Sequence, residues 1–259
     1  GEASTSGDTA FGIEPAGPMP AGSLPGASCR QRCERSSPML DFAQARRTMV
    51  DCQVRTFDVV DHALLSVLEE VPRERFVPAG QEAVAYSDRT ITLARFADGT
   101  ARVMLAPMVL ARMIQALAVT PGSRILDVAG GTGYSSAVLE RLGGKVTMVE
   151  SDSDLAERAK AVLADLGCDV SVKVGPVAQG YAADAPYDLI ILNGAYETVP
   201  DALLAQLSRE GRLVAIDASE GASKVVLFQR AGEAVGCRRL FDAAAPVVEG
   251  LRRQPAFQF

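Results

Sequence analysis

Beyond residue 122, short apolar runs alternate with stretches in which apolar residues recur every three to four positions. The runs are typical of strands and the stretches of amphipathic helices. We expect strands at Ile125–Val128, Val146–Val149, Val170–Val174, Asp188–Leu192, Arg212–Ile216 and Lys224–Gln229, and helices at Ser135–Leu142, Asp154–Leu166 and about Pro200–Leu207. Strands that alternate with helices predict an α/β fold with a doubly wound, mostly parallel sheet.

A different pattern precedes this alternation. Phe42, Ala45, Met49 and Cys52 have helical spacing. Further elements are expected as a helix at Asp61–Glu70, a hairpin of Thr90–Leu93 with Arg102–Leu105, and a helix from Pro107 through Leu117. We interpret residues 39–106 as an N-terminal helical and hairpin region of the same domain, and residues 107–259 as its ligand-binding core.

Residues 1–38 are rich in Gly, Pro, Ser and Ala and have no hydrophobic period, so we expect a disordered extension. A net charge of −6 argues against a broad nucleic-acid surface, and no apolar run approaches the roughly 20 residues that span a bilayer. The five cysteines are scattered, which favours reduced thiols and a cytoplasmic protein. With His62 as the single histidine, we expect no metal site.

The loop after the first core strand carries most of the chemical information. Its strand ends in an acid, Asp127, and Ala129-Gly130-Gly131-Thr132-Gly133 then leads into a helix. In an open parallel sheet, ligands bind at the carboxyl ends of the strands. Glycines let the backbone approach a ligand that a Cβ would block. We therefore expect a nucleotide-like ligand at this loop.

S-adenosylmethionine (SAM) fits this loop better than a dinucleotide. A pyrophosphate would be repelled by Asp127, whereas SAM has no phosphate and carries an ammonium and a sulfonium. Glu150 closes the next strand and would accept hydrogen bonds from ribose hydroxyls, and Asn193 would reach the same edge of the sheet. The structural alternatives are an ordinary helix cap at Asp127, a tight turn at Gly131 and Gly133, and a solvated carboxylate at Glu150.

The span from about Gln53 to Ile216 resembles the protein-L-isoaspartate O-methyltransferase family of class I SAM-dependent methyltransferases. The motifs that carry the resemblance are Val71–Pro78 with Tyr86–Asp88, Leu126–Ser136, Ala185–Ile191, Val199–Leu207 and Glu210–Val214. The resemblance implies a seven-stranded sheet with an antiparallel last strand. It also implies protein repair, in which the methyl group of SAM is transferred to an isoaspartyl carboxylate of damaged protein.

The resemblance suggests which residues bind the cofactor. They are Asp127, Ala129, Gly130, Gly131, Gly133, Tyr134, Glu150, Ser151, Gly175 and Asn193. We assign no catalytic residue, because the family's active-site serine is Leu105 here and the histidine often found five residues later is Leu110. The acid of the family's Gly-Asp-Gly is Pro176, and the first loop glycine is Ala129.

These departures keep other functions open. The main hypothesis is a carboxyl methyltransferase acting on isoaspartyl protein. The alternative is a weak or inactive family member that serves as a SAM-binding accessory subunit of a larger complex. A methyltransferase for another acceptor and a nicotinamide dehydrogenase complete the alternatives. A missing serine hydroxyl would remove hydrogen bonds worth about 1.5–3 kcal/mol each.

Overall fold

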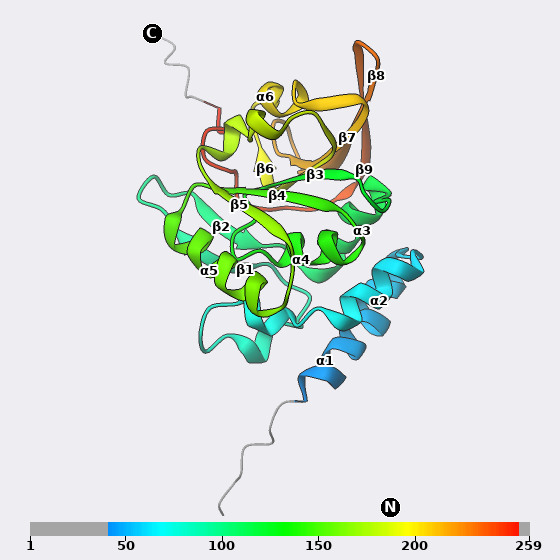
Figure 1. Cartoon of the computed structure of the whole chain (residues 1–259), viewed down its shortest axis with the longest axis vertical. Coiled ribbons are helices and arrows are strands. Elements are labelled where there is room, and N and C mark those ends of the chain that lie inside the picture. The colour runs from blue at the N-terminus through cyan, green and yellow to red at the C-terminus, as the bar shows by residue number, and fades with distance from the viewer. Residues whose placement is uncertain (1–40, 254–259) are drawn as a thin grey trace, which may run out of the picture. The chain divides into compact units, whose positions relative to one another are not determined.

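The computed structural model describes residues 41–253, which belong to one compact unit. The predicted extension 1–38 lies outside the described residues. A seven-stranded sheet in the order β5-β4-β3-β6-β7-β8-β9 forms the centre (Figure 1). Its strands are β3 Arg124–Val128, β4 Lys145–Glu150, β5 Val170–Val174, β6 Tyr187–Tyr196, β7 Leu207–Asp217, β8 Lys224–Ala231 and β9 Ala234–Asp242.

The predicted fold class is confirmed, with one difference in strand direction. Strands β3 to β7 pair in parallel. Strand β8 is antiparallel to both β7 and β9, so the reversed strand is the penultimate one and β9 runs in the direction of β7. Sequence reasoning missed β9, because its first six residues are exposed and show no buried apolar face.

Two hydrophobic clusters lie on opposite faces of the sheet, because side chains alternate between faces along a strand. Ile125 and Met148 belong to the cluster under α3 (Pro107–Leu117), α4 (Tyr134–Arg141) and α5 (Ser153–Asp165). Leu126 and Val149 belong to the other cluster.

The second face has thinner cover than the first. The helix expected at Pro200–Leu207 is only α6, Asp201–Leu204, and Leu207 already begins β7. Two short 3₁₀ turns, Val177–Gln179 and Ala182–Asp184, follow β5, and Val177 packs on this face together with Val248 and Leu251 of the C-terminal segment. The prediction of a full helix was wrong. Leu203 and Leu207 have helical spacing and are both buried, but Leu203 lies in α6 and Leu207 in β7.

The N-terminal elements pack below the sheet and lead to its carboxyl edge (Figure 1). They are α1 Phe42–Met49, a π-helical turn Val50–Val54, α2 His62–Glu70, and 3₁₀ turns at Arg55–Phe57, Arg73–Phe76 and Glu82–Val84. Asp41 and Asp61 cap α1 and α2 by accepting backbone N–H bonds. A two-stranded hairpin follows, made of β1 Ile91–Arg95 and β2 Ala101–Met104.

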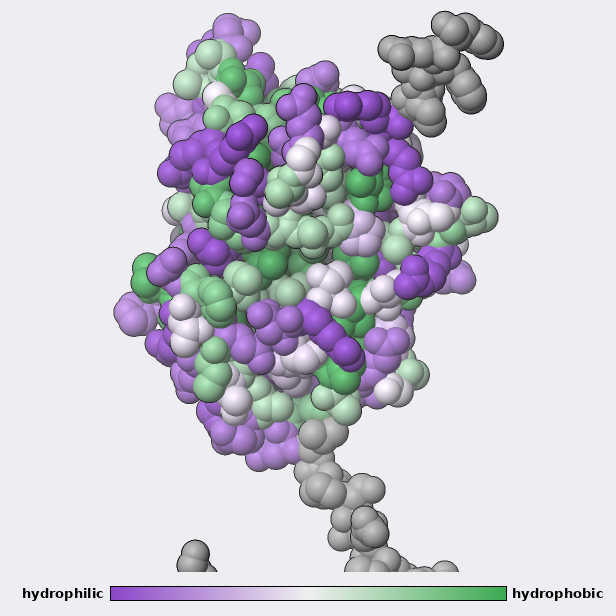
Figure 2. Space-filling view, turned by 180° about the vertical axis from the view of Figure 1, so that it is seen from behind, coloured by the Kyte–Doolittle hydropathy of each residue, from purple (hydrophilic) through white to green (hydrophobic). Residues whose placement is uncertain are grey.

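On the face of the molecule turned away in Figure 1, hydrophilic and hydrophobic residues are intermixed (Figure 2). Across residues 41–253, the helices are all too short or too polar to cross a bilayer.

Candidate functional site

The glycine-rich loop between β3 and α4 has a backbone that side chains would obstruct. Gly131 and Gly133 have φ of 61° and 93°, in the left-handed region that favours glycine. A Cβ on Gly130 would lie 2.8 Å from Met148 Cγ. Ala129 adopts φ 59° despite its methyl group, which costs about 1–2 kcal/mol. The loop therefore keeps a bare backbone at the end of β3.

This loop lies at the topological switch point of the sheet, where successive strands change from one side of β3 to the other. Strand β3 pairs with β4 on one side and with β6 on the other. The crevice at the carboxyl ends of such strands is where open α/β sheets bind ligands. Asp127, Glu150 and Asn193, on β3, β4 and β6, thus belong to one region of the molecule.

The Asp127 carboxylate is completely buried, and both of its oxygens accept hydrogen bonds. Its Oδ2 accepts the hydroxyls of Ser135 and Ser136 at 2.6 and 2.5 Å, and its Oδ1 accepts the Asn193 amide at 2.5 Å. Burial raises the pKa of Asp127 to about 6, although all three donors favour the charged form. Because Asp127 is buried and both of its oxygens already accept hydrogen bonds, it is not accessible to an ammonium in this arrangement; it ties the start of α4 to β3 and β6.

The Glu150 carboxylate is also taken, by an arginine that sequence reasoning missed. Arg102, on β2, donates from Nε at 2.8 Å to Oε2 and from Nη2 at 2.9 Å to Oε1. The side chains of Arg102 and Glu150 are 1% and 0% exposed. Glu150 also accepts the backbone N–H groups of Gly131 and Ser151, at 2.9 and 2.8 Å.

A second carboxylate, from the C-terminal segment, joins the buried Arg102–Glu150 pair to form an ion triad. Glu249 accepts from Arg102 Nη2 at 2.7 Å, and its side chain is 26% exposed. Burial opposes the positive charge of Arg102, but Glu150 and Glu249 outweigh this effect and raise the pKa of the guanidinium. Within the described part of the chain, Arg102 Nη1 and Glu249 Oε2 are buried without a hydrogen-bond partner.

The hairpin also covers the glycine loop directly. A Cβ on Gly131 would lie 2.5 Å from Leu93 Cδ1 of β1 and 3.4 Å from Arg102 Cγ of β2. Leu93 and Arg102 therefore fill the space in front of Gly131, on the side where a bound ligand was expected. No sequence signal marked this role, because Arg102 stands in a short strand far from Glu150 along the chain.

These contacts determine whether Glu150 and the glycine loop can bind SAM in the conformation described. A ribose would need free acceptor positions on Glu150, yet a carboxylate has about four lone-pair sites. Arg102, Gly131 and Ser151 already use them. The bare backbone suits the cofactor, but the occupied carboxylate and the covering side chains do not. In this conformation the site does not fit SAM.

The other candidate residues lie around this region with different exposures. Ser151 donates its hydroxyl to Glu249, which joins it to the triad. The half-buried Gly175 donates its N–H to the Glu150 backbone carbonyl at 2.9 Å, and Pro176 beside it is exposed. Tyr134 is buried in the first turn of α4, with the Arg73 guanidinium 4.7 Å from its ring centre.

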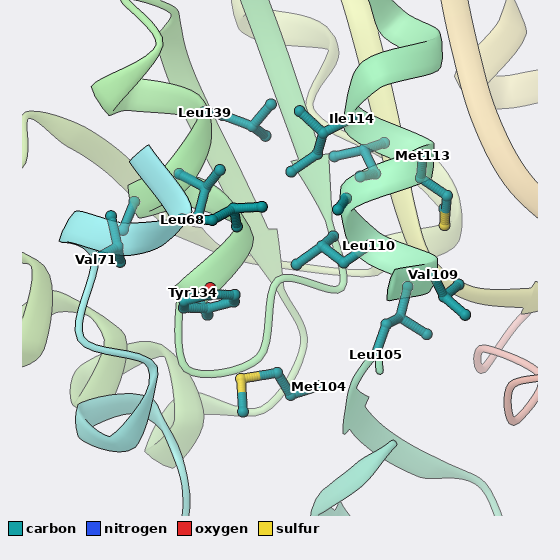
Figure 3. Packing of buried hydrophobic residues seen from close by; sticks show 14 of the residues in the cluster. Leu68, Val71, Met104, Leu105, Val109, Leu110, Met113, Ile114, Tyr134 and Leu139 are labelled. Atoms are coloured by element: carbon teal, nitrogen blue, oxygen red, sulfur yellow. The ribbon is translucent and has the colours of Figure 1, made fainter. Parts of the chain in front are cut away.

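The positions of the family's serine and histidine are part of the hydrophobic core. Leu105 and Leu110 are 1% and 2% exposed. Figure 3 shows both within the apolar packing around α3. The carbonyl of Leu105 accepts Arg73 Nη2 at 2.7 Å, and Arg73 Nε donates to the Ala85 carbonyl at the same distance. Arg73 thus anchors the backbone at Leu105, and burial lowers its pKa.

Acidic, cysteine and histidine side chains in residues 41–253 form no cluster of three that would hold a metal ion. Cys52, Cys168 and Cys237 are free thiols.

Comparisons with known proteins agree with this architecture. The family model "Protein-L-isoaspartate(D-aspartate) O-methyltransferase (PCMT)" matches residues 45–241. A protein-L-isoaspartate O-methyltransferase from Methylorubrum extorquens (strain PA1) is 39% identical over 198 residues, 76% of this chain and 85% of that protein. One from Roseiflexus sp. (strain RS-1) is 35% identical over 213 residues, 82% and 95% of the two chains.

Solved structures show the same fold. A protein-L-isoaspartate O-methyltransferase superposes with a TM-score of 0.69 at 23% identity, over 79% of this chain and 66% of that one. A Plasmodium falciparum protein assigned to the same activity, in complex with S-adenosyl-L-homocysteine, gives a TM-score of 0.66 at 16% identity, over 79% and 98%. With the family model and the sequence relatives, this places the chain in the SAM-dependent protein-L-isoaspartate O-methyltransferase family.

Proposed function

We propose that this chain methylates the α-carboxylate of isoaspartyl residues in proteins, with SAM as its cofactor. The family match over residues 45–241 is the observation that carries the proposal, and the glycine loop at the end of β3 lies where this fold binds its ligand. The relatives give no support to the alternative of an accessory subunit. A cytoplasmic site of action is part of the proposal, on the basis of the scattered cysteines.

The chain's own residues would act mainly by positioning. A substrate carboxylate is already a nucleophile at neutral pH, so the reaction needs no general base. Asp127 fixes the loop geometry through Ser135, Ser136 and Asn193. Once the side chains of Leu93 and Arg102 have moved away, Glu150 would hold the ribose of the cofactor. The backbone of Gly131 and Gly133 would contact the rest of the cofactor.

The part of the site that would face the methyl acceptor is less polar here than the family pattern implies. Leu105 offers no hydroxyl to the substrate carboxylate, and it lies in the core next to the Arg73 anchor. A lost charge-assisted hydrogen bond of about 1.5–3 kcal/mol corresponds to about a tenfold to hundredfold lower rate. We therefore expect slow methylation of isoaspartyl peptides rather than none.

The test is incubation of the purified chain with methyl-labelled SAM and an isoaspartyl peptide. The matched control is the same peptide with a normal aspartate. We expect a base-labile methyl ester on the isoaspartyl peptide alone. Folded protein that transfers no label at micromolar enzyme, or labels both peptides equally, would overturn the proposal.

A further inference from the structure

The triad of Arg102, Glu150 and Glu249 joins three segments that are distant in the sequence. Arg102 comes from the hairpin, Glu150 from the end of β4 and Glu249 from the C-terminal segment. We propose that Arg102 is a competitor, supplied by the chain itself, for the ribose-binding carboxylate, and that the β1–β2 hairpin must open before SAM binds. This inference rests on the proposed function, because it concerns the same site.

The Glu150 carboxylate has no free lone pair for a ribose hydroxyl while Arg102 is paired with it. Arg102 donates to both oxygens of Glu150, and the N–H groups of Gly131 and Ser151 occupy the remaining lone pairs. The backbone donors cannot leave without unfolding the loop or β4. Arg102 is the one of these donors on a flexible side chain, so a ribose diol gains access to Glu150 by displacing it.

Side chains of the hairpin also block the approach of a ligand to Gly131. Leu93 Cδ1 and Arg102 Cγ lie 2.5 and 3.4 Å from the position of a Cβ on Gly131. A ligand that approached the Gly131 backbone would meet both side chains. Since Leu93 is on β1 and Arg102 is on β2, displacement of the whole hairpin clears both contacts at once.

The closed state, in which Arg102 pairs with Glu150, leaves two buried polar atoms without hydrogen bonds. Arg102 Nη1 and Glu249 Oε2 are buried, and among residues 41–253 neither has a hydrogen-bond partner. Unsatisfied buried groups raise the free energy of a conformation. Glu249 is partly exposed, so it provides Arg102 with a partner nearer the surface when the pair with Glu150 breaks.

The consequence is a lowered apparent affinity. When only a fraction of the protein is in the binding-competent conformation, the apparent Kd equals the intrinsic Kd divided by that fraction. Weakening the closed state therefore tightens binding without any new contact to the ligand. Arg102 is a positioning residue in this account, not a catalytic one.

The test measures binding of S-adenosylhomocysteine by calorimetry to the full chain and to three variants. Arg102→Ala removes the competitor, and Leu93→Ala removes the steric cover with no change of charge. Arg95→Ala is the matched control, because Arg95 is an exposed arginine of the same hairpin. We expect about tenfold tighter binding for Arg102→Ala, a severalfold gain for Leu93→Ala and no change for Arg95→Ala.

Hydrogen exchange on the unmodified chain provides a readout that does not depend on whether Arg102→Ala folds. We expect S-adenosylhomocysteine to speed amide exchange in β1 and β2 and to slow it in the glycine loop. Unchanged exchange in the hairpin, or weaker binding by folded Arg102→Ala and Leu93→Ala, would overturn the inference and leave the proposed function intact. If the unmodified chain and all variants are folded and none binds at millimolar ligand, the proposed function fails as well.

Discussion

The buried carboxylate of Asp127 makes the stability of this protein depend on pH in a direction opposite to that of most acidic residues. Its pKa is raised from 3.8 to about 6, mainly by burial. The folded state thus binds this proton more tightly than the unfolded state. The contribution of Asp127 to the free energy of unfolding is fully present below pH 3.8 and is lost as the pH rises through 6.

The magnitude follows from the size of this shift. Each pH unit between the two pKa values corresponds to about 1.36 kcal/mol, so the whole contribution is about 3 kcal/mol. Between pH 8 and pH 5 the gain is about 1.4 kcal/mol, because protonation of the folded state is then nearly complete and that of the unfolded state has barely begun.

The assay is urea unfolding followed by far-ultraviolet circular dichroism, which suits a protein without tryptophan. The difference in unfolding free energy between the unmodified chain and Asp127→Asn isolates the contribution of Asp127 from those of other groups. We expect this difference to shift by about 1.4 kcal/mol in favour of the unmodified chain from pH 8 to pH 5.

Asp98→Asn is the control, since Asp98 is exposed and the Thr100 hydroxyl and N–H lower its pKa below 3.8. Its contribution to the free energy of unfolding changes only below about pH 4, so we expect no shift for Asp98→Asn between pH 8 and pH 5. A difference for Asp127→Asn that does not vary with pH, or that shifts in the other direction, would show that burial does not raise the pKa of Asp127 in the folded state.

Three further substitutions test the Arg73 anchor, the position of Leu105 and the contact between the hairpin and the glycine loop. Arg73→Ala leaves two buried carbonyls without a donor, and thermal unfolding should show a loss of about 3 kcal/mol; a loss below about 1 kcal/mol would contradict the anchoring role. Leu105→Ser should destabilise the core by about 2–4 kcal/mol, yet raise kcat/KM for an isoaspartyl peptide about tenfold, and an unchanged kcat/KM would argue against Leu105 bordering the acceptor. Gly131→Ala should lower the free energy of unfolding in urea by about 1 kcal/mol more than Gly122→Ala, because both glycines have positive φ but only Gly131 faces a neighbouring side chain. Equal losses of stability would mean that the hairpin does not contact the glycine loop.

Local patterns were sufficient to predict most of the sheet. Continuous apolar runs such as Leu189–Leu192 mark strands buried on both faces, and these positions are all at most 5% exposed. Strand β9 escaped because exposed edge residues carry no such pattern. The predicted helix at Pro200–Leu207 failed because apolar spacing does not distinguish a helix from a short turn that runs into a strand.

The sequence was sufficient to predict which residues form the candidate site, but not which side chains contact them. The glycines and the acids at the strand ends could be recognised from their order, since one fold places them together. The partners of those acids could not, because Arg102 and Glu249 reach Glu150 through tertiary packing. Likewise, the serines that hold Asp127 look like ordinary first-turn residues in the sequence.

A crystal structure of the chain with S-adenosylhomocysteine would show whether the ligand displaces Arg102 from Glu150. We expect ribose hydroxyls on the Glu150 carboxylate, the ligand over the backbone of Gly131, and Arg102 withdrawn from Glu150. A ligand bound elsewhere on the chain, or bound at this loop with the Arg102–Glu150 pair unbroken, would contradict this expectation.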